Sequence, residues 1–269
     1  MADAVRSPFA ARYGGWALVA GASEGLGAAF ADALAARGMP LLLLARRIDP
    51  LEATAQALRA RHGVEVRTAA IDLGHAELPQ RLEALTGELE IGVAIYNAAY
   101  APVGALTGRP LDELLRVVDV NVRAPLIFAR TLAPAMQSRG RGGLVLMSSL
   151  AGLQGSPRLA TYAATKAFNI ILAEGLWGEL RGSGVDVVAS CAGAIRTPGY
   201  ADTASAEAPG TMDADAVAEA TLRALGRGPR VVPGAVNKLA SVVMGRVLPR
   251  ARAVRLMGAQ TQSLHESDA

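Results

Sequence analysis

Short aliphatic runs that alternate with longer helix-forming stretches constrain this chain more than any other feature. The runs that predict strands are Trp16–Ala20, Leu41–Ala45, Val64–Ala70, Ile91–Tyr96, Gly143–Ser148, Val185–Cys191 and a short Arg230–Pro233. The stretches that predict helices are Gly25–Arg37, Pro50–Arg61, Ala76–Glu88, Leu111–Arg139 and Ala160–Arg181. Strands that alternate with helices in this way form right-handed βαβ units. The sequence therefore predicts an α/β fold with a mostly parallel seven-stranded sheet and helices on both faces.

Composition supports this fold and excludes several classes of protein. Aromatic residues make up only 4% of a 269-residue chain that is 51% hydrophobic, so the core must be mainly aliphatic, as in buried parallel strands. The formal net charge is only +3, and no basic stripe interleaved with aromatic residues is present. Nucleic acid is therefore not an expected partner. No shift in composition marks a second domain, so we expect residues 1–269 to form one domain.

Cysteine, histidine and hydropathy patterns bear on compartment and metal binding. Cys191 is the only cysteine, so the chain cannot form an internal disulfide, and a reducing cytoplasm is the simplest location. The three histidines (His62, His75 and His265) are scattered along polar stretches, and we expect no metal site. No apolar run reaches the roughly 20 residues that a membrane span requires.

A glycine-rich turn directly follows the first predicted strand, in the sequence Gly21-Ala22-Ser23-Glu24-Gly25-Leu26-Gly27. Glycines there let the backbone approach a pyrophosphate, and the helix that follows offers free N–H groups and positive partial charge. The alternative is a tight strand-to-helix turn that binds no ligand. Its position after the first strand favours a dinucleotide site.

The second predicted strand ends in Leu44-Ala45-Arg46-Arg47. In dinucleotide-binding folds an acidic residue at this strand end binds the ribose 2′-hydroxyl, whereas an arginine accommodates a 2′-phosphate. Arg46 and Arg47 therefore predict a preference for NADP(H) over NAD(H). The alternative is an ordinary solvated arginine pair at the start of a helix.

Three polar residues predict a catalytic site. Tyr162 and Lys166 are four residues apart, which places them on one face of a helix. A nearby cation stabilises a phenolate and lowers its pKa toward the useful range. Ser149 lies 13 residues before Tyr162, at the carboxyl end of the fifth predicted strand, where open α/β sheets bind ligands.

From Tyr13 to Thr197 the chain resembles the short-chain dehydrogenase/reductase family, which has a Rossmann-type doubly wound fold. The glycine turn, Asp72, Asn97-Ala98, Asn121, Ser149 and Tyr162 with Lys166 all fall in the order of that family. The resemblance implies that Tyr162 exchanges the proton with the substrate oxygen and that Ser149 orients that oxygen. Lys166 would hold the nicotinamide ribose and lower the pKa of the tyrosine, and Asn121 would help hold a water chain that leads to Lys166.

The resemblance also implies the rest of the cofactor site. The cofactor-binding residues would be Gly21, Ser23, Glu24, Gly25, Leu26, Gly27, Arg46, Arg47, Asp72, Leu73, Asn97, Ala98, Tyr162, Lys166, Gly193, Ile195 and Thr197. The chain departs from the family pattern at Ala20 (commonly Thr), at Ala99 (usually Gly) and at Ala192 (usually Pro). Glu24 also stands where relatives that prefer NADP often have Arg or Lys.

Substrate contacts are expected from loops above the strand ends. The candidates are Tyr100, Leu150, Leu153, Gln154, Tyr200 and Met212, with residues 192–213 as a substrate loop. Most of these residues are apolar and no arginine cluster accompanies them, so we expect an uncharged, hydrophobic ketone, aldehyde or alcohol. The alternative is that Leu150 and Leu153 are packing residues.

The tail from residue 234 to 269 mixes apolar and basic residues. It is expected to be helical and either packs on the domain or a partner subunit, over the pocket, or lies on a membrane surface. Pro249 interrupts any single long helix, which favours packing. Related enzymes assemble through two long helices, which in this sequence would be Leu111–Arg139 and Ala160–Arg181. We therefore expect a homodimer or homotetramer.

The leading functional hypothesis is reversible carbonyl reduction. An epimerase or a dehydratase with the same fold is an alternative. A dinucleotide sensor without turnover is another, but such a protein would be expected to lack Tyr162 or Lys166.

Overall fold

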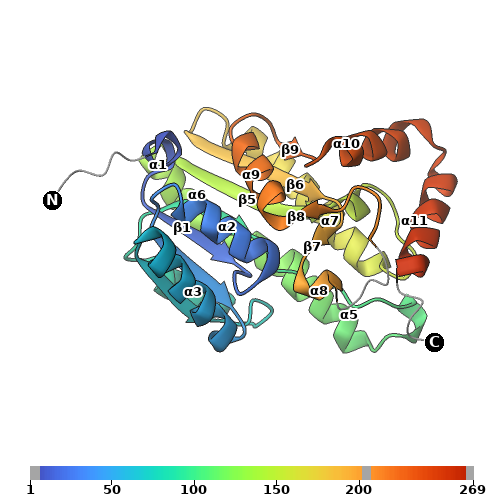
Figure 1. Ribbon diagram of the computed structural model, residues 1–269, viewed down its shortest axis with the longest axis horizontal. Coiled ribbons are helices and arrows are strands. Elements are labelled where there is room, and N and C mark those ends of the chain that lie inside the picture. Colours follow the sequence, from blue (N-terminus) through green and yellow to red (C-terminus); the bar gives the residue numbers. More distant parts are fainter. Residues whose placement is uncertain (1–6, 202–206, 265–269) are drawn as a thin grey trace.

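The computed structural model describes residues 7–201 and 207–264 and contains a seven-stranded, fully parallel sheet (Figure 1). Its order is β3-β2-β1-β4-β5-β6-β9. The strands are β1 Trp16–Ala20, β2 Leu41–Ala45, β3 Val66–Ala70, β4 Ile91–Tyr96, β5 Gly142–Ser149, β6 Val185–Ala192 and β9 Arg230–Val231. The predicted sheet is confirmed. Strand β3 begins two residues later than expected, because Gly63 ends the preceding helix in a left-handed conformation and two more residues carry the chain to the sheet.

Helices connect the strands and extend beyond them. They are α1 Pro8–Tyr13, α2 Gly25–Ala35, α3 Ile48–His62, α4 Leu78–Thr86, α5 Leu111–Val118, α6 Ala124–Arg139, α7 Ala160–Glu179, α8 Pro198–Ala201, α9 Ala214–Ala224, α10 Ala235–Val242 and α11 Arg250–Leu264. Two short strands, β7 Ile195–Arg196 and β8 Met212–Asp213, pair with each other outside the main sheet. The sequence analysis predicted neither α1, α9 nor this small pair of strands.

The long predicted helix Leu111–Arg139 is present but contains an irregular turn. A π-helical turn, Asp119–Arg123, separates α5 from α6. Tyr96 lies beneath this turn and donates a hydrogen bond of 2.6 Å to the Val120 carbonyl. Turns of this kind interrupt the regular helical hydrogen bonding and often occur at functional sites.

The sheet separates two hydrophobic layers. Along β1, Ala17 and Val19 face one layer while Leu18 and Ala20 face the other, as the two-residue period of a strand requires. Helices α1, α2, α3 and α9 cover the first layer, and α4, α6 and α7 cover the second. Helices on both faces make this a doubly wound sheet (Figure 1).

The strand order reverses between β1 and β4, and ligands bind to open α/β sheets at such a point. Residues 235–264 form α10, a second π turn (Val243–Val247) and α11, which project to one side of the sheet (Figure 1, right). Within residues 7–201 and 207–264, none of the helices has the length and apolarity needed to cross a membrane.

Candidate active site

The glycine-rich turn is locked against β4, at the point where the strand order reverses. A Cβ on Gly27 would lie 1.8 Å from the Gly21 carbonyl oxygen, and a Cβ on Gly21 would lie 2.7 Å from the Ala98 backbone. The Asn97 amide donates a 2.9 Å hydrogen bond to that same Gly21 carbonyl. Only glycine fits at these two positions, so the turn closes tightly and leaves the start of α2 exposed to a ligand.

A cleft of about 370 Å³ lies in front of this turn. Twelve of the predicted cofactor-binding residues line it: Gly21, Ser23, Glu24, Gly25, Leu26, Arg46, Arg47, Asp72, Leu73, Asn97, Ala98 and Thr197. The lining also includes residues that the sequence analysis had not selected, namely Ala45, Ile71, Ala99, Val120 and Pro198, and it includes Tyr100, which had been predicted to contact the substrate. We call this space the cofactor cleft.

Five of the predicted cofactor-binding residues lie outside the lining of the cofactor cleft. Gly27 is buried against the Gly21 carbonyl and Ile195 packs against the core, whereas Gly193 and Tyr162 line a second pocket. Lys166 lies in α7 and is buried, and its ammonium donates a hydrogen bond to the Met147 carbonyl of β5. The cleft therefore contains the predicted residues of the glycine turn and the strand ends, but not those near the reacting groups.

Two arginines enter the cofactor cleft at the end of β2. Arg47 pairs with Glu24 at 2.8 Å, and both side chains are at least half exposed. Arg46 makes no hydrogen bond or close ion pair with any residue in the described ranges, although its charge helps lower the pKa of Asp72. Arg46 can therefore bind an anion at once, whereas Arg47 must first exchange its carboxylate partner.

Asp72 also lines the cofactor cleft, after β3, the strand next to β2. Burial alone would raise the pKa of Asp72, but a hydrogen bond of 2.9 Å from Arg116 and another of 2.9 Å from the Gly74 N–H together hold this pKa below its ordinary value. Arg116 also stacks over the Tyr100 ring at 5.9 Å. Asp72 is thus fixed as a carboxylate whose direction is set by α5.

Ser149, Tyr162 and Lys166 come together at the carboxyl end of β5. Ser149 and Tyr162 line the same pocket, where the Ser149 hydroxyl lowers the pKa of the phenol, and the Ser149 oxygen accepts a hydrogen bond of 3.2 Å from the Ala151 N–H. The Lys166 ammonium lies 5.5 Å from the centre of the Tyr162 ring and donates to the Met147 carbonyl at 3.0 Å. Gly152 permits this packing, since a Cβ there would lie 2.7 Å from the Lys166 backbone. The predicted grouping of three side chains is present.

Burial has the largest effect on the pKa values of this group. Burial raises the pKa of Tyr162, and the hydrogen bond with Ser149 lowers it by less. Burial also lowers the pKa of Lys166 to about 8, with the charge of Cys191 opposing that change. Burial thus dominates the pKa of both groups in the protein alone, and the predicted lowering of the pKa of Tyr162 by Lys166 stays a prediction.

Asn121 is fully buried in the π turn and connects three elements. Its side-chain amide donates to the Tyr100 carbonyl at 2.8 Å and to the Thr165 hydroxyl at 3.2 Å, and its oxygen accepts from the Tyr100 N–H at 2.9 Å. Asn121 thus joins the loop after β4 to helix α7, on which Tyr162 and Lys166 lie. Its predicted role in a water chain stays a prediction.

A second pocket, of about 300 Å³, begins at Ser149 and Tyr162. Four of the predicted substrate residues line it: Leu150, Leu153, Gln154 and Tyr200. Met212 lines neither space; it lies in β8 and packs against the core. Residues that the sequence analysis missed complete the lining: Ala151, Ser156, Leu159, Ala194, Ala208, Pro209, Asn237, Ala240, Ser241, Met244, Met257 and Thr261. Because most of these side chains are apolar, we call this space the substrate pocket.

Asn237 fixes the start of the tail against the substrate pocket. Its buried amide donates to the Gly210 carbonyl at 3.0 Å and to the Pro233 carbonyl at 3.1 Å. Its oxygen lies where a Cβ on Gly193 or Gly210 would fall, at 2.7 and 2.6 Å. Two glycines in the segment after β6 therefore make room for one side chain from the tail.

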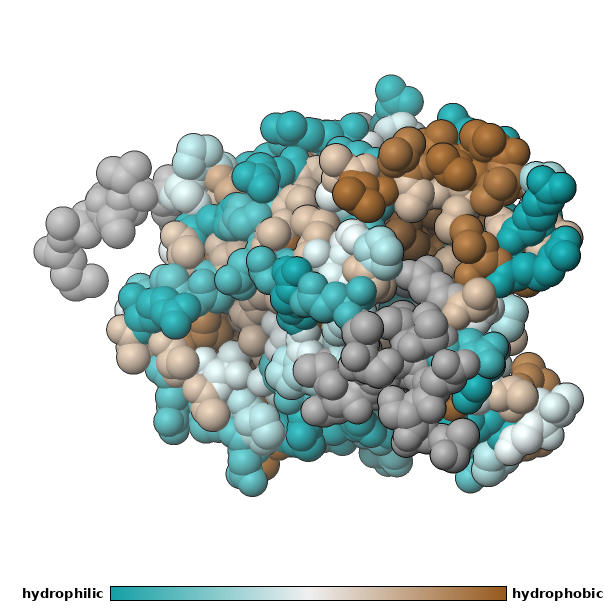
Figure 2. Space-filling model, turned by 45° about the vertical axis from the view of Figure 1, so that its right-hand side comes forward, coloured by the Kyte–Doolittle hydropathy of each residue, from teal (hydrophilic) through white to brown (hydrophobic). Residues whose placement is uncertain are grey.

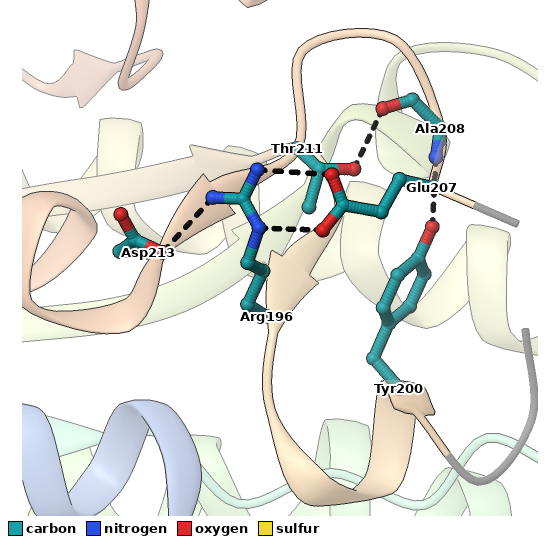
Figure 3. A network of polar contacts seen from close by, with 6 residues as sticks. All are labelled: Arg196, Tyr200, Glu207, Ala208, Thr211 and Asp213. Carbon is teal, nitrogen blue, oxygen red and sulfur yellow. Dashed lines mark hydrogen bonds and ion pairs between the residues drawn. The ribbon is translucent and has the colours of Figure 1, made fainter.

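The described residues between β7 and β8, 197–201 and 207–211, are held by a polar network (Figure 3). Arg196 makes two hydrogen bonds to Glu207, of 2.5 and 2.9 Å, and one to Asp213 of 2.9 Å. The Tyr200 hydroxyl accepts a hydrogen bond of 2.9 Å from the Ala208 N–H. This network positions Thr197 at the cofactor cleft and Tyr200 at the substrate pocket, so one segment borders both spaces.

The residues of the cofactor cleft fit a dinucleotide. Glu24, the N-cap residue just before α2, gives no side-chain hydrogen bond to the free N–H groups of that helix, so these can bind a pyrophosphate. The two glycines that tolerate no Cβ let the backbone come close, and Arg46, Arg47 and Asp72 lie at the strand ends where an adenosine moiety binds. The fold and site together define an oxidoreductase of the dinucleotide-binding class.

Comparison with known proteins specifies the family. A model of the short chain dehydrogenases matches residues 15–208. The chain is 34% identical over 190 residues to the 7beta-hydroxysteroid dehydrogenase of Clostridium sardiniense, a match that covers 71% of this chain and 73% of that protein. It is 33% identical over 183 residues to the very-long-chain 3-oxoacyl-CoA reductase of Laccaria bicolor, which covers 66% of this chain but only 54% of the reductase. The chain belongs to the short-chain dehydrogenase/reductase family.

Solved structures agree. A 7beta-hydroxysteroid dehydrogenase structure superposes with a TM-score of 0.85 at 26% identity and covers 93% of this chain and 98% of that one. A short-chain dehydrogenase from Sphingobium yanoikuyae in complex with NADPH gives a TM-score of 0.73 at 31% identity, with 94% and 95% covered. The protein is therefore an oxidoreductase of this family that acts on hydroxyl or carbonyl groups.

Proposed function

We propose that the protein is an NADP(H)-dependent oxidoreductase that interconverts an uncharged, hydrophobic ketone or aldehyde and the corresponding alcohol. The observation that carries this proposal is the grouping of Ser149, Tyr162 and Lys166 at one end of the substrate pocket. An acid–base group must lie within hydrogen-bond reach of the substrate oxygen, and the two hydroxyls of this group line the same pocket.

In the direction of reduction, each side chain has a separate task. Ser149 accepts from the Ala151 N–H and keeps its own proton to donate to the carbonyl oxygen. Tyr162 donates the proton that this oxygen gains as it becomes a hydroxyl. Bound NADPH supplies the hydride that the carbonyl carbon receives. Because the pKa of Tyr162 is raised by burial, the phenol keeps its proton at neutral pH and is a proton donor.

Lys166 orients this group from behind. Its ammonium donates to the Met147 carbonyl in β5, which holds it 5.5 Å from the Tyr162 ring. When the phenol has given up its proton, this cation stabilises the phenolate, and the attraction is strong because the surroundings are buried. Asn121 and Thr165 keep α7 in register with the loop that carries Tyr100.

Preference for NADP(H) is supported by Arg46 and Arg47 in the cofactor cleft. Guanidinium groups make paired, charge-assisted hydrogen bonds to a phosphate. A relative in complex with NADPH is consistent with this choice. Replacing both arginines with Ala and titrating NADPH and NADH in parallel tests the preference. NADPH binding should weaken much more than NADH binding, and unchanged discrimination would refute it.

A hydrophobic substrate is supported by the lining of the substrate pocket, in which Leu150, Leu153, Leu159 and Met244 accompany Ser149 and Tyr162. The names of two relatives, a 7beta-hydroxysteroid dehydrogenase and a very-long-chain 3-oxoacyl-CoA reductase, refer to a steroid and to a long acyl chain, which are both hydrophobic groups. We expect a homo-oligomer in the cytoplasm. Exposed apolar residues on the two long helices, such as Leu111 at 70% and Ile171 at 67%, suit an assembly face.

Tyr162→Phe provides the decisive experiment. Loss of the phenol should lower kcat with a panel of ketones by roughly 10²–10⁴-fold, the range of general acid catalysis, while NADPH binding is retained. Tyr13→Phe removes a hydroxyl that bonds only Asp186, far along the chain from the site, and is the matched control. Undiminished ketone reduction by Tyr162→Phe would refute the assignment. NADPH binding by the native protein without turnover of any ketone or alcohol would favour a dinucleotide sensor instead.

A further inference from the structure

Helix α10 and the π turn after it present two different faces. Ala240, Ser241 and Met244 line the substrate pocket. On the outside, Val236, Leu239, Val242 and Val247 are 58%, 66%, 48% and 67% exposed. We call these four residues the outer apolar face. Large aliphatic side chains are rarely exposed to water in a contiguous group unless they contact another surface.

Cations accompany the outer apolar face, and acidic residues do not. From Gly234 to Leu264 the sequence contains no aspartate or glutamate and five basic residues, namely Lys238, Arg246, Arg250, Arg252 and Arg255. In the part of the chain that the structure describes, none of these five makes an ion pair, whereas arginines elsewhere, such as Arg37 and Arg196, do. The positive charge of this segment is thus available to a partner.

Figure 2 shows this arrangement on the molecular surface. Hydrophobic residues gather over α10 at the upper right, and hydrophilic residues border them along the edge formed by the start of α11. An exposed aliphatic patch bordered by unpaired cations matches the interface of a membrane that contains acidic lipids. The aliphatic side chains enter the acyl boundary and the cations bind the headgroup phosphates.

A second copy of the chain fits this face less well. Most homodimers are two-fold symmetric, so the same patch would meet itself. Lys238 and Arg246, which lie in α10 and the π turn themselves, would then approach their own copies, and like charges brought together across an interface oppose association. An acidic lipid surface satisfies the charges and the aliphatic groups together.

We propose that α10 and the following π turn bind the surface of anionic membranes, with Val236, Leu239, Val242 and Val247 at the acyl boundary and Lys238 and Arg246 at the headgroups. The sequence analysis treated packing and membrane contact as alternatives. The structure reconciles them, since the inner face of α10 packs on the substrate pocket while its outer face is free for lipid. This inference concerns binding alone and does not depend on the proposed reaction.

Co-sedimentation of the full chain with lipid vesicles tests the proposal. Vesicles of phosphatidylcholine alone are compared with vesicles that also contain phosphatidylglycerol, at low and at high ionic strength. The protein should bind the anionic vesicles, and salt should weaken that binding. Leu239→Ser should weaken it roughly tenfold. Lys238→Gln and Arg246→Gln should each weaken it roughly fivefold.

Matched controls separate this face from general stickiness. Leu106→Ser removes an aliphatic group that is 52% exposed, against 66% for Leu239, but lies in the short turn before α5. Arg223→Gln removes an exposed cation from α9. Both controls should bind vesicles as the native protein does, and all variants should keep the native melting temperature. Absence of vesicle binding, or equal loss in the controls, would overturn the proposal. So would a fall in molar mass by light scattering in Leu239→Ser, because it would assign the face to a second copy.

Discussion

Substitution of Glu24 by Gln should increase the preference for NADPH. Glu24 occupies Arg47 through an ion pair of 2.8 Å in the cofactor cleft, with the side chains 62% (Arg47) and 50% (Glu24) exposed. An exposed pair of this kind contributes about 0.2–1 kcal/mol, which a 2′-phosphate must overcome to engage Arg47. Glu24→Gln removes that competition and the repulsion between carboxylate and phosphate. A gain of about 1 kcal/mol corresponds to roughly fivefold tighter NADPH binding. NADH binding should change little.

Fluorescence titration of both nucleotides measures this effect. Glu65→Gln is the matched control, because Glu65 pairs with Arg67 at 2.9 Å at comparable exposure but lies outside the cofactor cleft. Arg47→Gln should weaken NADPH binding. When Arg47→Gln is already present, the addition of Glu24→Gln should not change NADPH binding further, as expected if Glu24 acts through Arg47. Unchanged or weaker NADPH binding by Glu24→Gln would show that Arg47 does not meet the phosphate, and the reasoning would fail.

Three further predictions follow from the geometry. Asn237→Ala should lower the free energy of unfolding by about 1–3 kcal/mol in a urea titration and raise KM, because two carbonyls lose their buried donor; an unchanged KM would exclude a role in shaping the pocket. Gly27→Ala should abolish NADPH binding, since its Cβ would lie 1.8 Å from the Gly21 carbonyl oxygen, and normal binding with a native circular dichroism spectrum would contradict this packing. The free energy of unfolding of the native protein, taken relative to that of Lys166→Met, should increase between about pH 8 and pH 10.5. In that interval the unfolded chain keeps the lysine proton that the folded protein has lost; a flat difference in urea titrations would show that the pKa of Lys166 is not lowered.

The sequence allowed prediction of features set by local spacing. The glycine turn, the arginines after β2 and the pair of Tyr162 and Lys166 each follow from a few neighbouring residues, and parallel strands bring such segments to one edge of the sheet. The seven strands could be predicted because their aliphatic runs are continuous. Helix α9 was missed although its composition, with Asp213 before it and several alanines within it, is typical of a helix.

Features set by long-range contacts could not be predicted. Asn237, Met244 and Met257 reach the substrate pocket because the tail folds back over it, and nothing in their spacing indicates that position. Met212 was predicted to contact the substrate, but pairing of β8 with β7 turns it toward the core. The raised pKa of Tyr162 depends on burial, which the four-residue spacing to Lys166 does not reveal.

The match to the family model ends at residue 208, whereas the substrate pocket is completed by Pro209 and by side chains from Asn237 to Thr261. The cofactor cleft thus lies wholly within the part that matches the family, whereas the substrate pocket is shared between that part and the stretch after it. Exchange of the last sixty or so residues between relatives should therefore shift substrate range while leaving nucleotide choice where it was, which makes the carboxyl-terminal part a natural unit for building chimaeric enzymes.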